Sequence, residues 1–366
     1  MLRVLVIAGL LASVGATSID QSPSGTLVPA PAMRMARAAH TATALRDGRV
    51  LVAGGFTSAA DPTSGAELFV PGAGRFAPLP PMRVLRHSHS ATRLANGMVL
   101  IAGGFAAGNQ PTARAELFDP VANRFVETGA MTEPRSGHVA MLLPDGRVLI
   151  TGGVGPDWKF LATAELFDPA TGRFSATGAM SVARESHAAV LLSDGTVFIV
   201  GGHRDRRDQI KIYKTSERYD PRTGRFRIDG EMRVARHKHD AILLRDGRVL
   251  ITGGSDERDG GGVFSSTEVY DPRTRRFSDG PRLVRGRYKH QGTGLLRPDG
   301  SVLIAGGAPV AEVIDASATR STVVPGEVTM AGQFSAVAPL PDGGALITGG
   351  YGNGTGPRGS TWRIRP

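Results

Sequence analysis

The sequence predicts an all-β fold in which seven similar four-stranded units close into a ring. Three observations support this. A glycine pair recurs seven times, a tight-turn signal precedes each pair, and no long amphipathic helical pattern is visible. The pairs are Gly54-Gly55, Gly103-Gly104, Gly152-Gly153, Gly201-Gly202, Gly253-Gly254, Gly306-Gly307 and Gly349-Gly350, separated by 49, 49, 49, 52, 53 and 43 residues. Repeats of this length with four short strands each are typical of the blades of a β-propeller.

The third unit, residues 131–174, shows how the strands are predicted. Two apolar runs, 138–143 and 147–151, flank Asp145-Gly146, which supplies the positive φ angles of a tight hairpin turn. A variable loop follows Gly152-Gly153, and residues 164–167 and 173–177 form strands three and four around a turn at Asp168-Pro169. The hairpin signal recurs at Asp47, Asn96, Asp194, Asp246, Asp299 and Asp342. All seven units therefore carry the hairpin.

The two ends of the chain predict how the ring closes. Residues 361–366 take the place that strand three, residues 66–71, has in the first unit, so the last unit stops one strand short. Residues 26–33 precede the first unit as the fourth strand of one unit precedes the next. We therefore expect the N-terminal strand to complete blade seven, and residues 26–366 to form a single domain.

The first 25 residues have a different character. Residues 1–16 combine a basic Arg3, a short apolar run and small residues at its end, which is the pattern of a secretory signal peptide. An uncleaved anchor or a buried first strand is the alternative, but the run is short for a membrane span. Residues 17–25 are rich in Ser and predict a linker. We expect a secreted or periplasmic protein with no stable membrane span after cleavage.

Composition limits the classes of partner. The formal net charge is +10 and the pI is about 10.5, which favours anionic partners. The arginines are spread over turns in every repeat, however, and are not interleaved with stacking aromatic residues, so we expect no nucleic-acid binding. The chain has no cysteine, which excludes a disulfide framework. We expect a monomer.

The repeated unit resembles a known family. Its form, M-x-x-x-R-x-x-H-x-A-x-x-L-x-D-G-R-V-L-I-x-G-G followed by A-E-L-F-D-P-x-T-G-R-F, is similar to the kelch repeats of bacterial secreted proteins over residues 26–366. Two features depart from the family: Phe replaces the usual Trp of strand four, and the sixth repeat has Asp315-Ala316 in place of Asp-Pro. The resemblance implies a kelch-type β-propeller of the galactose-oxidase-like superfamily, which binds its ligands through loops on one face.

That face, which we call the mouth, carries the loops after the glycine pairs and the Arg-x-x-His segments. Six arginines (Arg37, Arg86, Arg135, Arg184, Arg236 and Arg287) each precede a histidine by three residues (His40, His89, His138, His187, His239 and His290). Each repeat with this Arg also has a Glu in strand three: Glu67, Glu116, Glu165, Glu217, Glu268 and Glu312.

Two roles are open for these arginines. They could form a ring that binds acidic ligands, as in some kelch proteins, or each could pair with its Glu, because a Glu between blades needs a cationic partner. In the seventh unit Gly332, Ser335 and Trp362 replace Arg, His and Glu together. This joint loss favours the structural pair, since an unpaired buried charge is costly.

The histidines do not predict a metal site. His87 with His89, and His237 with His239, are expected to place two imidazoles on one face of a strand, which a metal ion could bridge. No carboxylate accompanies either pair at ligand spacing. We therefore expect no metal and no cofactor, and packed, hydrogen-bonded roles for the repeated histidines.

Non-repeating residues in the mouth loops are the better binding candidates. The candidate ligand-binding residues are Trp158, His203, Arg204, Arg206, Arg207, Tyr288 and Lys289. An aromatic ring beside several cations could hold a sugar or an anionic glycan by stacking and charge-assisted hydrogen bonds. Solvated loops without a ligand are the alternative.

Two functions remain. The first is a binding or scaffold module for a glycan or an envelope protein. The second is a carbohydrate-active enzyme similar to the sialic-acid mutarotase of the periplasm, which needs only acid–base groups in the mouth. Galactose-oxidase copper chemistry is disfavoured, because in that family it requires a cysteine. No catalytic residue is assigned, and we lean against an enzyme.

Overall fold

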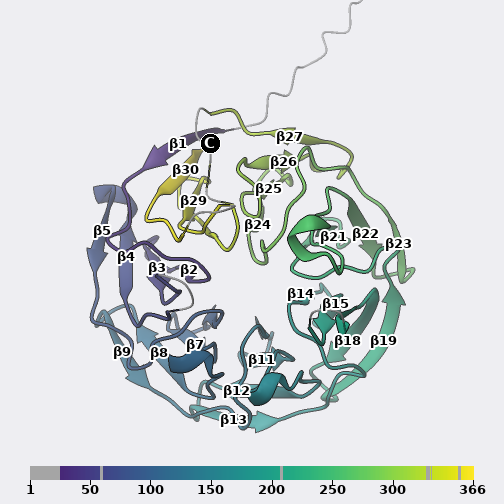
Figure 1. Cartoon of the computed structure of the whole chain (residues 1–366), viewed down its shortest axis with the longest axis horizontal. Coiled ribbons are helices and arrows are strands. Elements are labelled where there is room, and N and C mark those ends of the chain that lie inside the picture. The colour runs from purple at the N-terminus through teal and green to yellow at the C-terminus, as the bar shows by residue number, and fades with distance from the viewer. Residues whose placement is uncertain (1–24, 58–60, 207–208, 327–329, 331, 353–355) are drawn as a thin grey trace, which may run out of the picture.

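The computed structural model describes residues 25–57, 61–206, 209–326, 330, 332–352 and 356–366. Seven antiparallel four-stranded sheets are arranged in a ring around a central axis (Figure 1). The predicted seven-bladed β-propeller is thus confirmed. Within the described ranges, no helix is long and apolar enough to cross a membrane. The expected signal peptide, residues 1–16, and all but the last residue of the expected linker lie outside these ranges.

Each blade runs from the axis outwards. Blade 1 contains β2 (Thr41–Ala44), β3 (Val50–Ala53), β4 (Ala66–Val70) and β5 (Arg75–Pro78). Blade 2 contains β6 (Ser90–Arg93), β7 (Val99–Ala102), β8 (Ala115–Asp119) and β9 (Arg124–Glu127). Blade 3 contains β10 (Val139–Leu142), β11 (Val148–Thr151), β12 (Ala164–Asp168) and β13 (Arg173–Ala176). Blade 4 contains β14 (Ala188–Leu191), β15 (Val197–Val200), β18 (Thr215–Asp220) and β19 (Arg225–Glu231), with a small extra hairpin of β16 (His203–Arg204) and β17 (Lys211–Ile212).

The remaining blades follow the same order. Blade 5 contains β20 (Asp240–Leu243), β21 (Val249–Thr252), β22 (Thr267–Asp271) and β23 (Arg276–Asp279). Blade 6 contains β24 (Gly294–Leu296), β25 (Val302–Ile304), β26 (Glu312–Ile314) and β27 (Ser321–Val323). Blade 7 contains β28 (Ala336–Pro339), β29 (Ala345–Thr348), β30 (Thr361–Arg365) and, outermost, β1 (Thr26–Ala30).

The second strand of each blade is the most deeply buried. Every residue of β3, β7, β11, β15, β21, β25 and β29 is buried, because both faces of these strands pack against neighbouring blades. This explains their nearly continuous Val, Leu and Ile sequences, in place of the alternation seen in half-exposed strands. The core is therefore distributed between adjacent blades around the ring.

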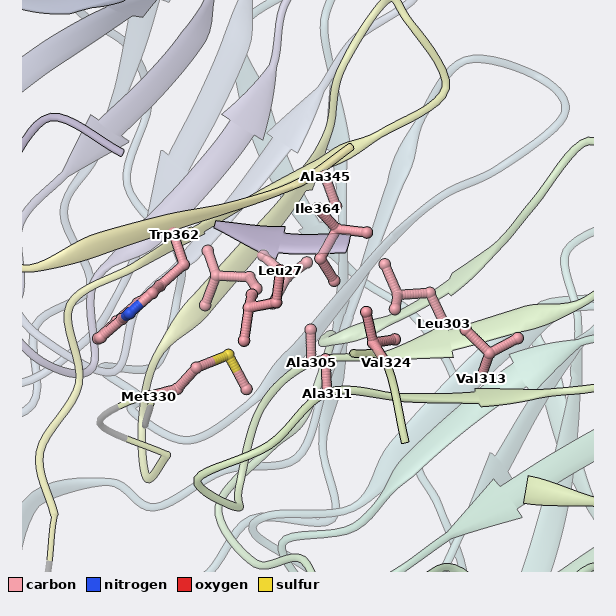
Figure 2. Close-up of a cluster of buried hydrophobic side chains, with 12 residues drawn as sticks. Leu27, Leu303, Ala305, Ala311, Val313, Val324, Met330, Ala345, Trp362 and Ile364 are labelled. Carbon is pink, nitrogen blue, oxygen red and sulfur yellow. The ribbon is translucent and has the colours of Figure 1, made fainter. Parts of the chain in front are cut away.

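The ring closes at blade 7 as the chain ends predict. Strand β1 pairs antiparallel with β30, and Leu27 lies opposite Ile364. Leu27, Ile364 and Trp362 enter one apolar cluster that also contains Met330 and residues of blade 6 (Figure 2). The outermost strand thus comes from the N-terminal side of the propeller and the other three from its C-terminal end.

Blades 1 to 6 each contain a buried Arg–Glu ion pair. The Arg Nη2 to Glu Oε1 distances are 2.7–3.0 Å for Arg37–Glu67, Arg86–Glu116, Arg135–Glu165, Arg184–Glu217, Arg236–Glu268 and Arg287–Glu312. Each arginine is fully buried and also donates from Nη1 to the carbonyl oxygen of the first glycine of its pair, at 2.7–2.8 Å. The arginines are therefore inside the blades and unavailable to a ligand.

The glycine pairs are close contacts between blades. Gly152 has a φ of +62°, and a Cβ there would lie 2.4 Å from the carbonyl oxygen of Arg184 in the next blade. The N–H of Gly153 donates to that same oxygen at 2.9 Å. A larger residue at Gly152 would be strained and would push the blades apart.

Replacing Glu165 with Gln should destabilise the protein by up to about 3–5 kcal/mol, because the buried guanidinium of Arg135 then keeps only the partly exposed carboxylate of Glu133, 3.6 Å away, as a counter-charge. The double variant Arg135→Met with Glu165→Leu removes both charges and should recover most of this loss. Urea unfolding followed by circular dichroism measures both free energies. Unchanged stability in Glu165→Gln would contradict a structural role for the pair.

Candidate functional site

Seven residues, one from each blade, line the channel at the mouth. They stand immediately before the repeated His, or before Ser335 in blade 7. They are Ala39, Ser88, Gly137, Ser186, Lys238, Lys289 and Phe334, and all have φ between +51° and +62°. Backbone N–H to C=O hydrogen bonds of 3.0–3.2 Å join Ser88 to Ala39, Gly137 to Ser88, Ser186 to Gly137, Lys238 to Ser186, Phe334 to Lys289, and Ala39 to Phe334. We call these seven residues the inner ring.

The inner ring corrects one expectation about the histidines. His87 and His89 were expected on one face of a strand, as were His237 and His239. Strand β6 begins only at Ser90 and β20 at Asp240, so both pairs lie in the preceding turns. Because the intervening residue has a positive φ, the two imidazoles of each pair have different surroundings. His89 contacts Thr41 of blade 1 at 3.2 Å, whereas His87 packs between Phe56 and Phe105.

A cavity of about 540 Å³ lies over the inner ring, and all seven ring residues line it. One wall is aromatic. Rings follow one another in the order Phe334, Tyr351, Phe56, His87, Phe105 and Trp158, with centroids 5.3–6.1 Å apart, and all of them except Tyr351 line the cavity. Trp158, in the short helix η3 (Pro156–Trp158), is 49% exposed at the end of this series. Blades 7, 1, 2 and 3 thus provide a continuous aromatic wall.

The opposite wall is charged and begins at Glu185. Its carboxylate is 3.0 Å from Arg206 Nη2, and the guanidinium of Arg206 lies 3.8 Å from the ring centre of Trp158. Burial raises the pKa of the Glu185 carboxyl, and the positive charges of Arg206 and Lys238 oppose this rise. Arg206 therefore joins the charged wall to the aromatic wall by an ion pair and a cation–π contact.

Two histidines in edge-to-face contact follow Glu185, with an angle of 76° between their rings. His203 Nε2 is 3.6 Å from the Glu185 carboxylate, and His203 Nδ1 is hydrogen-bonded to His237 Nδ1 at 3.1 Å. His237 Nε2 lies 3.0 Å from Ser255 Oγ. Burial lowers the pKa of His203 to about 2 and that of His237 to about 4, so both imidazoles are neutral at physiological pH. A bond between two Nδ1 atoms requires one to be the donor and the other the acceptor.

Two lysines complete the charged wall. Lys238 Nζ is 2.8 Å from an Asp259 carboxylate oxygen and 3.4 Å from the hydroxyl of Tyr288. Lys289 Nζ donates to the hydroxyl of Tyr351 at 2.8 Å. Among the described residues, Lys289 makes no ion pair. Burial lowers the pKa of both lysines.

The predicted binding residues have different places in this site. Trp158, His203, Arg206 and Lys289 line the cavity. Tyr288 is buried beside the two lysines and does not line it. Arg204 is outside the cavity and pairs with Asp205 at 3.3 Å. Arg207 lies outside the described residues.

Sequence reasoning missed Glu185, Lys238 and Asp259. The first two occupy the two variable positions of Arg-x-x-His, where most other repeats have Ala, Ser, Gly or His. A comparison of the seven repeats at these positions would have singled them out. Asp259, in the short helix η5 (Asp259–Gly261), belongs to the acidic fifth loop, and no repeat pattern indicates that it reaches Lys238.

A second hollow of about 970 Å³ continues outwards from the cavity. It shares Trp158, His203, Arg206, Lys238 and Asp259 with the first and adds residues of the third, fourth and fifth loops, among them Phe160, Gln209 and Glu257. The site is therefore elongated from the inner ring towards the rim of blades 3 to 5. It has room for more than one ring of a chain-like ligand.

Comparisons with known proteins give the fold alone. No family model and no curated protein matches the chain. The solved structure of a fungal alcohol oxidase, described as having catalytic diversity among the AA5 family and in complex with copper, is similar at a TM-score of 0.71 and 13% identity, over 93% of this chain and 76% of the oxidase chain. The protein YjhT is similar at a TM-score of 0.62 and 15% identity, over 80% of this chain and 99% of its own. This likeness is consistent with the kelch-type propeller that the repeats predict.

The copper of the AA5 oxidase does not fit the residues of this cavity. The chain has no cysteine. In the described part of the chain, no three His, Asp or Glu side chains gather where they could hold a metal ion. The closest imidazoles, His203 and His237, have their Nδ1 atoms engaged with each other. We derive no step through copper.

Replacing Arg206 with Ala should expose the face of Trp158 that the guanidinium covers, so acrylamide quenching of tryptophan fluorescence should increase. The chain has two tryptophans, and the second, Trp362, is buried and contributes a constant background. Arg204→Ala is the matched control, because Arg204 does not line the cavity. Equal quenching in the two variants would mean that Arg206 does not cover Trp158 in solution.

Proposed function

We propose that this chain is an exported, monomeric binding module that holds an acidic glycan in the channel cavity. The observation that carries the proposal is an aromatic wall facing a charged wall across one cavity. Sugar rings have apolar C–H faces that stack on aromatic side chains, and their hydroxyl and carboxylate groups accept hydrogen bonds from cations. The cavity offers both kinds of contact to one ligand.

The balance of charge supports an anionic ligand. Arg206 and Lys238 each have a carboxylate partner, Glu185 and Asp259 respectively. Lys289 lines the same cavity, and its described hydrogen-bond partner is a phenol. The cavity therefore carries about one positive charge in excess, or more when Glu185 is protonated. A single carboxylate on the ligand would balance Lys289.

Export is the part of the proposal that rests on sequence alone. It is supported by the signal-peptide pattern of residues 1–16. The absence of cysteine is compatible with a module that relies on its core for stability in an oxidising compartment. An envelope protein that presents an acidic group to the same cavity is the other form that the ligand could take.

Isothermal titration calorimetry with glucuronic acid and glucose oligosaccharides tests the proposal, after a glycan array has selected a ligand. Trp158→Ala should weaken binding of both classes by about 0.5–1.5 kcal/mol through lost stacking. Lys289→Gln should weaken the acidic ligand by about 1.5–3 kcal/mol, through the lost charged hydrogen bond, and leave the neutral one nearly unchanged. Equal loss for both ligands in Lys289→Gln would contradict charge recognition at this residue.

One observation favours an enzyme as the second candidate. Glu185 is buried, its pKa is raised, and it lies in the cavity beside a hydrogen-bonded pair of imidazoles. A carboxyl group of raised pKa can transfer protons near neutral pH, which ring opening of a sugar requires. This candidate would be an epimerase similar to the sialic-acid mutarotases.

The enzyme candidate predicts that the protein accelerates mutarotation of a reducing acidic sugar, measured by polarimetry or by NMR of the anomeric protons. Glu185→Gln should then reduce the rate by about 10²–10⁴-fold while binding persists. Because the Glu185 pKa is raised, a base role requires its deprotonated form, and the rate should fall as the pH falls through that pKa. Sugar binding without faster mutarotation in the unchanged protein supports the binding module. If the protein neither binds a sugar nor accelerates mutarotation, a protein ligand is the remaining alternative.

A further inference from the structure

Lysine is rare in this chain, and its placement is selective. The sequence contains five lysines and 38 arginines. Arginine supplies the buried ion pairs of the blades and most of the charged turns. Two of the five lysines nevertheless occupy neighbouring positions of the inner ring, Lys238 in blade 5 and Lys289 in blade 6. An arginine keeps its charge in proteins, whereas a lysine can lose its proton and become a nucleophile. The cavity therefore has two ammonium groups beside the guanidinium of Arg206, whereas most cations elsewhere in the molecule are guanidinium groups.

The two lysines have different surroundings. Lys238 is held by Asp259 at 2.8 Å, which favours its charged form. Lys289 Nζ lies 4.7 Å from the ring centre of Tyr288, 5.1 Å from that of Phe334 and 5.4 Å from that of Tyr351. Within the described residues, no carboxylate lies within ion-pair distance of Lys289. Its amine is thus enclosed by three aromatic rings but open to the cavity.

The groups around Lys289 lower the pKa of its ammonium, so a larger fraction of this amine is uncharged than in an exposed lysine. Burial lowers its pKa, and the carboxylate of Asp259, acting from a greater distance, opposes this effect only in part. The positive charge of Lys289 helps to lower the pKa of Lys238, so the two ammonium groups repel each other across the cavity. A lysine desolvated by apolar neighbours and placed beside a second cation is an activated nucleophile. The Tyr351 hydroxyl, 2.8 Å from Nζ, has a pKa raised by burial and remains a proton donor.

We propose that the Lys289 amine forms an imine with the open-chain aldehyde of a reducing sugar bound in the cavity. The inference rests on the proposed function for the sugar, but the reactivity of the amine does not. The amine lone pair attacks the carbonyl carbon, the carbonyl oxygen takes up a proton and the nitrogen releases one, which gives a neutral carbinolamine. Its hydroxyl group then leaves as water after protonation, and a C=N bond forms with a positive charge on nitrogen. No oxidant or reductant is consumed, and addition of water reverses the sequence.

Tyr351 is well placed for the proton transfers. Its hydroxyl contacts Nζ, so it lies close to the oxygen of a carbinolamine formed there. The imine would fix the reducing end of the ligand at the inner ring and direct the rest of the chain along the aromatic wall towards Trp158. This orientation matches the elongated shape of the site.

Reductive trapping tests the reactivity without any need for glycan recognition. The full-length protein is incubated with glycolaldehyde and sodium cyanoborohydride at neutral pH, and the labelled lysines are identified by peptide mass mapping. Lys289 should be labelled faster than the exposed Lys211 and Lys214, because its lowered pKa makes the neutral, nucleophilic fraction of the amine larger. Its labelling should also reach half its maximum rate at a lower pH.

Two variants sharpen the result. Lys289→Arg keeps the cation and removes the nucleophile, so the fast label should disappear while the preference for acidic sugars persists. Lys214→Arg is the matched control at an exposed lysine and should leave the fast label in place. A circular dichroism spectrum and melting temperature equal to those of the unchanged protein show that each variant is folded.

The outcomes separate the two proposals. Labelling of Lys289 no faster than that of Lys211 and Lys214 overturns the inference, even if acidic glycans bind. Fast labelling of Lys289 by glycolaldehyde supports the reactive amine, even if no glycan binds and the proposed function fails. A reducing sugar that binds but is never trapped at Lys289 overturns imine formation with the ligand.

Discussion

The buried ion pair between the arginine of each Arg-x-x-His segment and the glutamate of strand three is the interaction on which the rest of this propeller depends. In each of blades 1 to 6 the guanidinium joins three parts of the repeat: the segment entering the blade, the glycine pair and strand three. Because the arginine enters the blade, it fixes the turn that follows it, and that turn carries the inner-ring residue. A contact that stabilises one blade therefore also sets the geometry of the site. The cost of burying two charges is offset by the many hydrogen bonds that each one makes.

Blade 7 shows what happens when the pair is absent. Trp362 replaces the glutamate and packs with Met330 and Leu27 in an apolar cluster, and Gly332 replaces the arginine. Phe334 nevertheless keeps the positive φ and the inner-ring hydrogen bonds of the other blades. The inner ring is thus maintained by its neighbours as well as by the ion pair of its own blade. A well-packed apolar group of similar volume can replace a buried pair of charges.

Function is concentrated where the repeats differ. The same position recurs seven times around the channel, so a substitution there changes one side of the cavity without altering the scaffold. Blades 1 to 3 have Ala39, Ser88 and Gly137 at this position and leave room for the aromatic wall, whereas blades 5 and 6 have lysines. The placement of the few lysines in this arginine-rich chain shows the same division between the repeated scaffold and the variable cavity. Arginines with permanent charges stabilise the blades, whereas two amines whose protonation depends on burial face the cavity beside Arg206.

The sequence alone determined the seven blades, the tight turn in each one and the closure by residues 26–30, because glycine pairs, Asp-Gly turns and apolar runs act locally and recur. It also identified Trp158, His203, Arg206 and Lys289 as residues outside the repeat. Only the tertiary structure decided which of them share a cavity, since residues about 50 positions apart become neighbours when the ring closes. It placed Tyr288 behind the cavity and Lys289 in it because only Lys289 has the positive φ of the inner ring. It also brought Asp259 to Lys238 and left Lys289 among aromatic rings, a difference that depends on loop packing and burial and has no signal in the repeat.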